Sequence, residues 1–88
     1  MITKTFIIQN KYGLHARPAA LFVQAAAEYE SEVFLGKDGV EVNGRSIMGV
    51  LMLAAEKGSE ITLRVDGEDE AEAIDALVAL LNGNLDNE

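Results

Sequence analysis

The chain lacks cysteine altogether and contains one proline and one histidine among its 88 residues. Without cysteine it can form neither a disulfide nor a thiolate metal site, which agrees with a reducing compartment. We therefore expect no metal ion and no bound cofactor. The single histidine is His15, and no thiol competes with it as a nucleophile.

Basic residues are also scarce, with 7 Lys and Arg against 15 Asp and Glu and a formal net charge of -8. This balance argues against nonspecific binding to nucleic acid and against adhesion to anionic lipid. No segment approaches the roughly 20 apolar residues that span a bilayer, and the first apolar stretch is too short for a signal peptide. We expect a cytoplasmic protein whose partners are proteins, with no nucleic acid and no membrane among them.

Hydrophobic residues make up 49% of the chain and charged residues 25%, which is typical of a globular protein. A chain of this length can close one modest core. We expect a single domain over residues 1–88.

The spacing of apolar residues predicts seven elements in the order βαββαβα. Strands are expected at 2–9, 32–37, 40–43 and 61–66, and helices from just after His15 to about Ala26, at 47–55 and at 69–82. The links should be a turn at 10–13, a hairpin turn at 37–39 and a helix end at Gly83, with a fraying tail at 84–88. Because the strands are half polar, helices should cover one face only, giving an α/β (α+β) open-faced β-sandwich.

The same periodicity selects the side chains that should face the core. In the strands these are Ile2, Phe6, Ile8, Val33, Leu35, Val40, Val42, Ile61, Leu63 and Val65. In the first and last helices they are Ala19, Phe22, Val23, Ala26, Ile74, Leu77, Val78 and Leu81.

The segment GLHARPAALFVQAA, residues 13–26, carries the first chemical signal. Helix N-termini are positive and usually attract acidic residues, yet here they meet His15 and Arg17. A cation in that place costs up to about 1 kcal/mol unless an anion compensates it.

This combination suits phosphate chemistry. The amides of Ala16 and Arg17 and the guanidinium can hold a phosphate, while a ring nitrogen of His15 accepts its phosphorus. Pro18 fits as the third helical residue, because its position has no intrahelical N–H partner to lose. The alternative is that His15 only caps the helix and Arg17 only solvates it.

The segment NGRSIMGVLMLAA, residues 43–55, carries the second signal. Ser46 stands where an N-cap hydroxyl belongs, and it is either a cap alone or a regulatory phosphorylation site. A phosphate would bring about -2 charge to a helix start that tolerates it. Beside it, Ile47, Met48 and Leu51 either complete the core or form a docking patch for partners, to which we add Ala20.

Both segments, together with the length and element order, resemble the histidine-containing phosphocarrier (HPr) family of the bacterial phosphoenolpyruvate-dependent sugar phosphotransferase system. The resemblance covers essentially the whole chain. It implies a four-stranded antiparallel sheet covered by three helices, and a monomeric carrier rather than an enzyme. It also implies that Nδ1 of His15 takes a phosphoryl group from enzyme I and passes it to IIA domains of sugar permeases.

The resemblance further implies that Ser46 is a target of HPr kinase/phosphorylase. The chain is also similar to the nitrogen-related paralogue NPr, while His15 argues against a regulatory branch that lacks the histidine. Where family members often carry a late lysine in the first helix, this chain has Gln24 and Ala27, which implies weaker docking onto acidic partners.

Two competing functions belong to other classes. A pure interaction module would bind a transcriptional regulator or a metabolic enzyme through the patch and a modified Ser46. A free-standing phosphatase would need a water-activating carboxylate, and the sequence gives no sign of one near His15.

Overall fold

The computed structural model describes residues 1–9 and 11–82 of the chain. The described strands are β1 (Ile2–Ile7), β2 (Glu32–Lys37), β3 (Val40–Asn43) and β4 (Glu60–Asp66), and the described helices are α1 (Ala16–Ala26), α2 (Ile47–Met52) and α3 (Glu70–Asn82). The predicted order βαββαβα is confirmed. The expected turn residue Asn10, the helix end at Gly83 and the tail at 84–88 lie outside the described residues.

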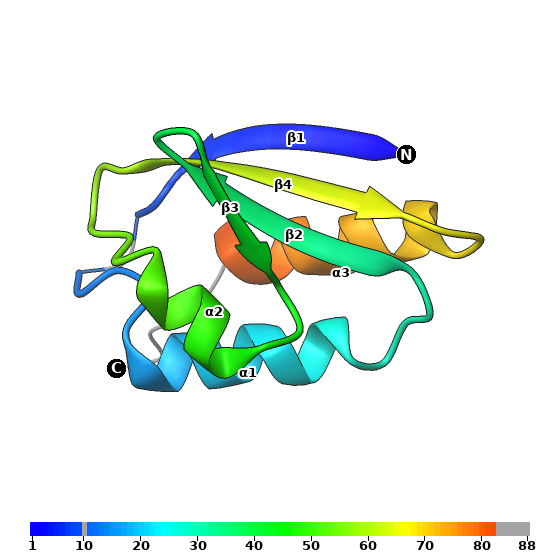
Figure 1. Cartoon of the computed structure of the whole chain (residues 1–88), viewed down its shortest axis with the longest axis horizontal. Coiled ribbons are helices and arrows are strands. Elements are labelled where there is room, and N and C mark those ends of the chain that lie inside the picture. Colours follow the sequence, from blue (N-terminus) through cyan, green and yellow to red (C-terminus); the bar gives the residue numbers. More distant parts are fainter. Residues whose placement is uncertain (10, 83–88) are drawn as a thin grey trace.

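The strands form one four-stranded sheet in the order β1-β4-β2-β3. Every neighbouring pair is antiparallel, with Ile2 opposite Val65 in one ladder and Leu35 opposite Leu63 in the next. The helices lie on one face of the sheet and leave the other face open (Figure 1). The predicted open-faced β-sandwich is therefore confirmed.

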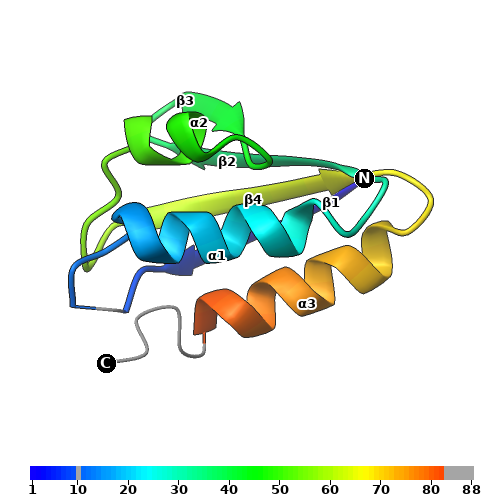
Figure 2. The ribbon, with the colours of Figure 1, turned by 90° about the horizontal axis from the view of Figure 1, so that it is seen from below.

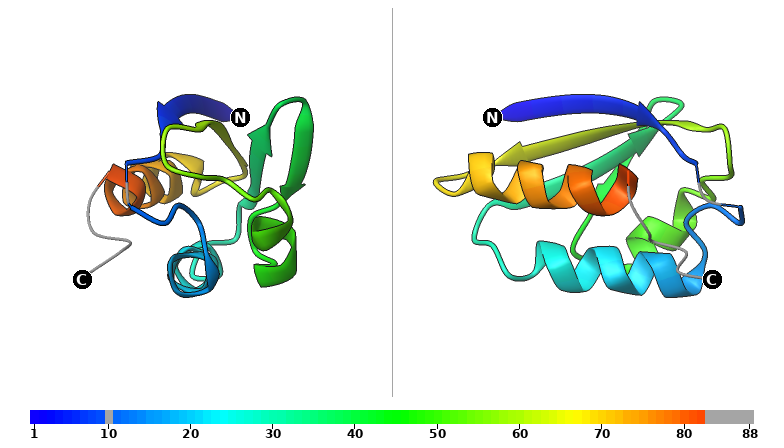
Figure 3. Two further views of the ribbon diagram at one scale, coloured as in Figure 1. Left: turned by 90° about the vertical axis from the view of Figure 1, so that its left-hand side faces the viewer. Right: turned by 180° about the vertical axis from the view of Figure 1, so that it is seen from behind.

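The core fills the space between the sheet and the helices. Helices α1 and α3 run side by side beneath the sheet, and the short α2 packs against α1 and β3 (Figures 2 and 3). The buried hydrophobic side chains are Ile8, Leu14, Ala19, Phe22, Ala26, Val33, Leu35, Val50, Leu53, Ala55, Ile61, Leu63, Val65, Ala73, Ile74, Leu77 and Leu81. The predicted core positions Ile2, Phe6, Val23, Val42 and Val78 are half-buried against this cluster.

Val40 was expected to face the core, and that prediction is wrong, because 57% of its surface is exposed. It pairs with Lys37 at the tip of the β2–β3 hairpin. The cross-strand neighbour Lys37 is polar, and its Nζ donates to the carbonyls of Leu53 and Ala54. Alternation along a strand gives the face of a residue but not how far the helices extend over that face.

Two element ends also differ from the prediction. Strand β1 ends at Ile7 instead of Gln9, and Ile8 exchanges backbone hydrogen bonds with the loop at Gly58 and Ser59. Helix α2 ends at Met52 instead of Ala55, because Ala54 adopts a left-handed φ of 51°. A helix cannot continue through a left-handed residue, which costs an L-residue roughly 1–2 kcal/mol.

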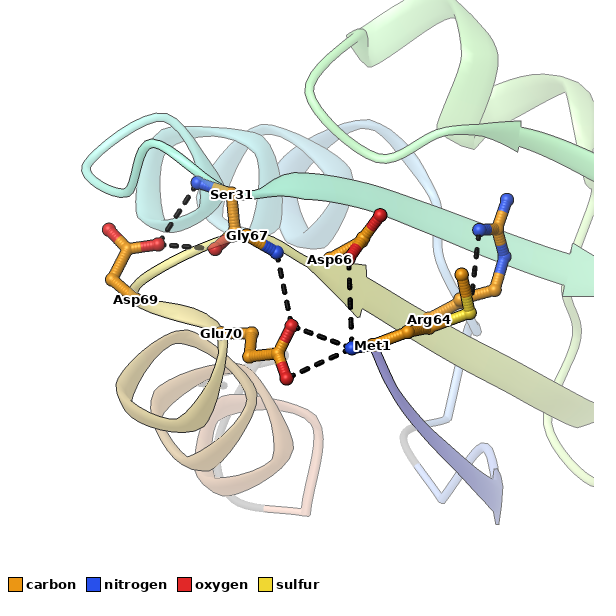
Figure 4. Close-up of polar contacts among 7 residues, drawn as sticks. All are labelled: Met1, Ser31, Arg64, Asp66, Gly67, Asp69 and Glu70. Carbon is orange, nitrogen blue, oxygen red and sulfur yellow. Dashed lines mark hydrogen bonds and ion pairs between the residues drawn. The ribbon is translucent and has the colours of Figure 1, made fainter.

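A polar group that we call the far-end cluster lies where α1 leads into β2 and β4 leads into α3 (Figure 4). Its first half is centred on Asp69. The buried Ser31 donates its hydroxyl and its amide to Asp69 Oδ1, the amide at 3.0 Å, and the Glu30 amide donates to Oδ2 at 2.9 Å. These bonds, the Ser31 hydroxyl first among them, lower the pKa of Asp69.

The second half of the far-end cluster ties the chain start to α3. The Met1 ammonium lies 2.8 Å from Glu70 Oε1 and 3.6 Å from Asp66 Oδ1, and the Gly67 amide donates to Glu70 Oε1 at 3.1 Å. The hydrogen bond to Glu70 is the main reason that the pKa of the ammonium is raised. The same bond is the main reason that the pKa of Glu70 is lowered.

Candidate functional site

His15 is the N-cap residue of α1. Its backbone is extended, with φ of -82° and ψ of -170°, and its carbonyl accepts the Ala19 amide at 2.9 Å. Its side chain makes no capping hydrogen bond. The imidazole therefore does not cap the helix, and a chemical role for His15 stays a prediction.

The imidazole ring is half-buried, and its two nitrogens differ. The Nε2 atom of His15 has less than 1 Å² of exposed surface. An incoming group cannot reach a buried nitrogen without displacing its surroundings. Of the two ring nitrogens, Nε2 is therefore the one that is closed to a partner.

The ring borders an open depression of about 250 Å³ between the loop before α1 and the end of α2. The lining residues are Tyr12, Leu14, His15, Leu51, Ala54, Ala55 and Glu56. The two walls are fastened together, since the Leu14 amide donates to the Ala55 carbonyl at 2.9 Å. The depression thus joins two segments that are about 40 residues apart in the sequence.

Gly13 allows this close approach. Its φ is +68°, and a Cβ placed there would collide with the Ala55 carbonyl oxygen and lie 2.8 Å from the Cα of Glu56. Any side chain at position 13 would push the two walls apart. The glycine before Leu14 and His15 is therefore a requirement of the site.

Arg17 is the second residue of α1, and both it and Ala16 are exposed. The guanidinium of Arg17 has no hydrogen bond or ion pair with any residue in 1–9 or 11–82. The first turn of α1 contains no acidic residue, and Pro18 is buried as its third residue. An anion arriving at this end would find two exposed residues and a guanidinium with no partner in the described part of the chain.

Tyr12 belongs to the site and was missed by the sequence analysis. Its ring meets the His15 ring edge to face, with centroids 5.8 Å apart and an angle of 85° between the planes. Lys11 Nζ lies 5.2 Å from the centroid of the same tyrosine ring. The available signal was an aromatic residue placed three positions before the only histidine.

Glu56 corrects another expectation. The sequence gave no sign of a carboxylate near His15, but Glu56 lines the same depression. The fold brings it there from the loop after α2. It adds a carboxylate to the lining of the depression.

Ser46 is the N-cap of α2, and its Oγ accepts the Gly49 amide at 3.1 Å. The capping role is confirmed, and a regulatory role stays a prediction. Ser46 and the His15 depression lie at opposite ends of α2, because Leu51 and Ala54 line the depression from the C-terminal side.

The patch predicted for docking lies between these two ends. Ile47 and Met48 are exposed, whereas Leu51 and Ala20 are half-buried. Met52, which the sequence analysis did not include, is 76% exposed and stands one helical turn from Met48. The exposed apolar surface of α2 therefore consists of Ile47, Met48 and Met52.

Comparison with known proteins gives consistent matches. The family model for the PTS HPr component phosphorylation site matches residues 2–83. Phosphocarrier protein HPr of Neisseria meningitidis serogroup A is 52% identical over 83 residues, which cover 94% of this chain and 93% of the relative.

Two solved structures are similar in fold. HPr from Thermoanaerobacter tengcongensis aligns with a TM-score of 0.93 and 46% identity, covering 100% of this chain and 98% of the other. Crh of Bacillus subtilis, in a crystal structure described as a dimer with a swapped domain, aligns with a TM-score of 0.76 and 50% identity over 93% of this chain and 94% of the other.

Proposed function

The chain belongs to the HPr family of phosphotransferase-system phosphocarriers, and from this premise we propose that His15 is the residue that carries the phosphoryl group. Enzyme I, charged by phosphoenolpyruvate, is the proposed donor, and IIA domains of sugar permeases are the proposed acceptors. The observation that carries this proposal is a half-buried imidazole with a buried Nε2 at the start of α1.

The proposed chemistry needs little from the protein beyond position and charge. The lone pair on Nδ1 of His15 forms the bond to phosphorus while the bond from phosphorus to the donor breaks. The amides of Ala16 and Arg17 and the guanidinium then stabilise the phosphoryl oxygens. Donation to the acceptor reverses these steps, so the protein is a covalent intermediate in a relay and not an enzyme.

The deciding experiment combines the protein with purified enzyme I and labelled phosphoenolpyruvate. We expect acid-labile label on the wild-type chain and none on His15→Ala, while far-UV circular dichroism confirms that the variant is folded. Equal labelling of the two chains would contradict the proposal. Transfer of the label to a sugar-type or a nitrogen-type IIA domain then separates the sugar branch from the alternative NPr-type branch.

We also propose Ser46 as a regulatory phosphorylation site. A phosphate there would place about -2 charge beside the exposed Ile47 and Met48 without opposing the helix dipole. This change would alter partner binding at the docking patch of Ala20, Ile47, Met48 and Leu51 and leave the fold intact. A transcriptional regulator is a candidate partner for such a switch.

This part is tested with HPr kinase/phosphorylase and ATP. We expect acid-stable phosphate on the wild type and none on Ser46→Ala. Persistence of the acid-stable label in the variant would refute the assignment of Ser46. The alanine variant also loses its helix cap, so its thermal midpoint must be measured alongside.

We further propose that the carrier acts as a monomer in the cytoplasm. No helix within residues 1–9 and 11–82 has the length and apolar character to cross a bilayer. Sedimentation equilibrium over a range of concentrations should give the mass of one chain. A dimer at low concentration would instead favour an assembly of the kind described for Crh.

A further inference from the structure

We infer that Tyr12 is a positioning residue that sets the orientation of the His15 ring for phosphoryl transfer. The inference rests on the proposed function and adds a specific residue to it. Tyr12 lines the His15 depression and makes the one aromatic ring contact found among the described residues.

The need for such a contact follows from the imidazole itself. Rotation about the bond between Cβ and the ring is broad, so an unrestrained histidine presents Nδ1 to a partner over a wide range of ring angles. In-line transfer tolerates little error in the position of the attacking atom. Burial of Nε2 restrains the His15 ring on one side, and a further contact on the exposed side would narrow its rotation.

The Tyr12 ring provides that restraint. At 5.8 Å between centroids and 85° between planes, the contact has the edge-to-face geometry that aromatic pairs prefer. This preference depends on the angle between the rings, so turning the imidazole would disrupt it. An aliphatic side chain of similar size would fill the space without preferring one angle.

The exposure of Tyr12 supports this role. Its surface is 58% exposed, so most of the ring contributes nothing to the core. Lys11 Nζ lies 5.2 Å from the centroid of the Tyr12 ring, which keeps a positive charge close to the pair. Tyr12 therefore contacts both the His15 ring and the Lys11 ammonium, a cation suited to an incoming phosphoryl group.

The test compares Tyr12→Phe, which keeps the ring, with Tyr12→Leu, which removes it. The matched control is Tyr29→Leu, a change at the other tyrosine, which packs half-buried against the core. The first readout is nitrogen NMR on chains labelled at histidine, which follows the two ring nitrogens and the rotational averaging of His15. The second is the kcat and KM for labelling by enzyme I and phosphoenolpyruvate.

We expect Tyr12→Leu to increase the rotational averaging of the His15 ring and to lower kcat on the order of tenfold, with a smaller change in KM. Tyr12→Phe should behave as the wild type in both readouts, and Tyr29→Leu should leave the His15 NMR signals unchanged. A wild-type NMR spectrum in Tyr12→Leu, or a loss seen in KM alone, would overturn the inference. If the wild type itself is not labelled, the proposed function fails, while the NMR comparison still tests the contact.

Discussion

The two ends of α1 use their polar groups in opposite ways. At the C-terminal end, the far-end cluster pairs Ser31 with Asp69 and the Met1 ammonium with Glu70. At the N-terminal end, the Arg17 guanidinium has no partner in the described ranges, and Ala16 and Arg17 are exposed residues. The polar groups of one end satisfy one another and close the fold, whereas the other end is the one at which we propose that an anion binds.

One glycine at each end of α1 allows the two ends to be compared by the same substitution, and these substitutions have the largest expected effects. Gly13 and Gly67 both have positive φ, and a Cβ at Gly67 would lie 2.7 Å from the Cα of Ser31. We expect Gly13→Ala and Gly67→Ala each to lower the free energy of unfolding by about 1–3 kcal/mol. Only Gly13→Ala should also slow labelling by enzyme I, because it displaces the wall of the His15 depression.

Urea denaturation and the labelling assay measure the two effects separately. The comparison fails if Gly67→Ala slows labelling as much as Gly13→Ala does while the protein is fully folded.

Ser31→Ala sharpens the same contrast with a smaller change. It removes a buried hydroxyl that donates to Asp69, and the expected loss is about 1–2 kcal/mol in the free energy of unfolding. The pKa of Asp69 should return toward its ordinary value of 3.8, since this hydroxyl is the largest cause of its lowering. A carboxyl titration by NMR checks that shift, and the rate of labelling at His15 should not change.

The pH dependence of stability should report on the far-end cluster. The pKa of Glu70 is lowered, so its contribution is complete above the ordinary value of 4.5 and is lost as pH falls through the folded-state pKa. The pKa of the Met1 ammonium is raised, so its contribution is complete below 8.0 and is lost as pH rises through the folded-state pKa. We expect a plateau between these values, with small losses on both sides because the groups are solvent-exposed.

Urea midpoints at acid, neutral and alkaline pH test this dependence. Glu70→Gln serves as the control, because removing the carboxylate should flatten the alkaline side and reduce the acid loss. An unchanged alkaline limb in that variant would show that another group is responsible.

The smallest expected effect is at the functional end. Ala54 is held at φ of 51°, which a glycine adopts without strain but with a greater entropy loss on folding. These opposing terms should leave Ala54→Gly within about 1 kcal/mol of the wild type, on the stabilising side. A marked destabilisation in thermal unfolding would mean that the alanine methyl is needed in the depression.

Periodicity was sufficient for the element order and for 12 of the 17 buried hydrophobic residues, and it did not select Leu14, Val50, Leu53, Ala55 and Ala73. The helical spacing of Ala19, Phe22 and Ala26 places all three in the interior, and the alternation of Leu63 and Val65 does the same for β4. The periodicity prediction was wrong at Val40, because alternation along a strand does not indicate how far the helices extend over the sheet. The predicted end of α2 was wrong because an apolar run contains no signal for an alanine with a left-handed backbone.

The sequence by itself determined that an imidazole ring would precede an arginine at a positive helix start, because capping and dipole effects act within one turn. It also determined which faces are apolar, since side-chain direction follows the period of the helix or strand. Only the tertiary structure decided that Tyr12, Ala54 and Glu56 line the same depression as His15 and that Nε2 is a buried nitrogen. These facts depend on how the loop before α1 meets the loop after α2, and packing between distant segments leaves no local pattern in the chain.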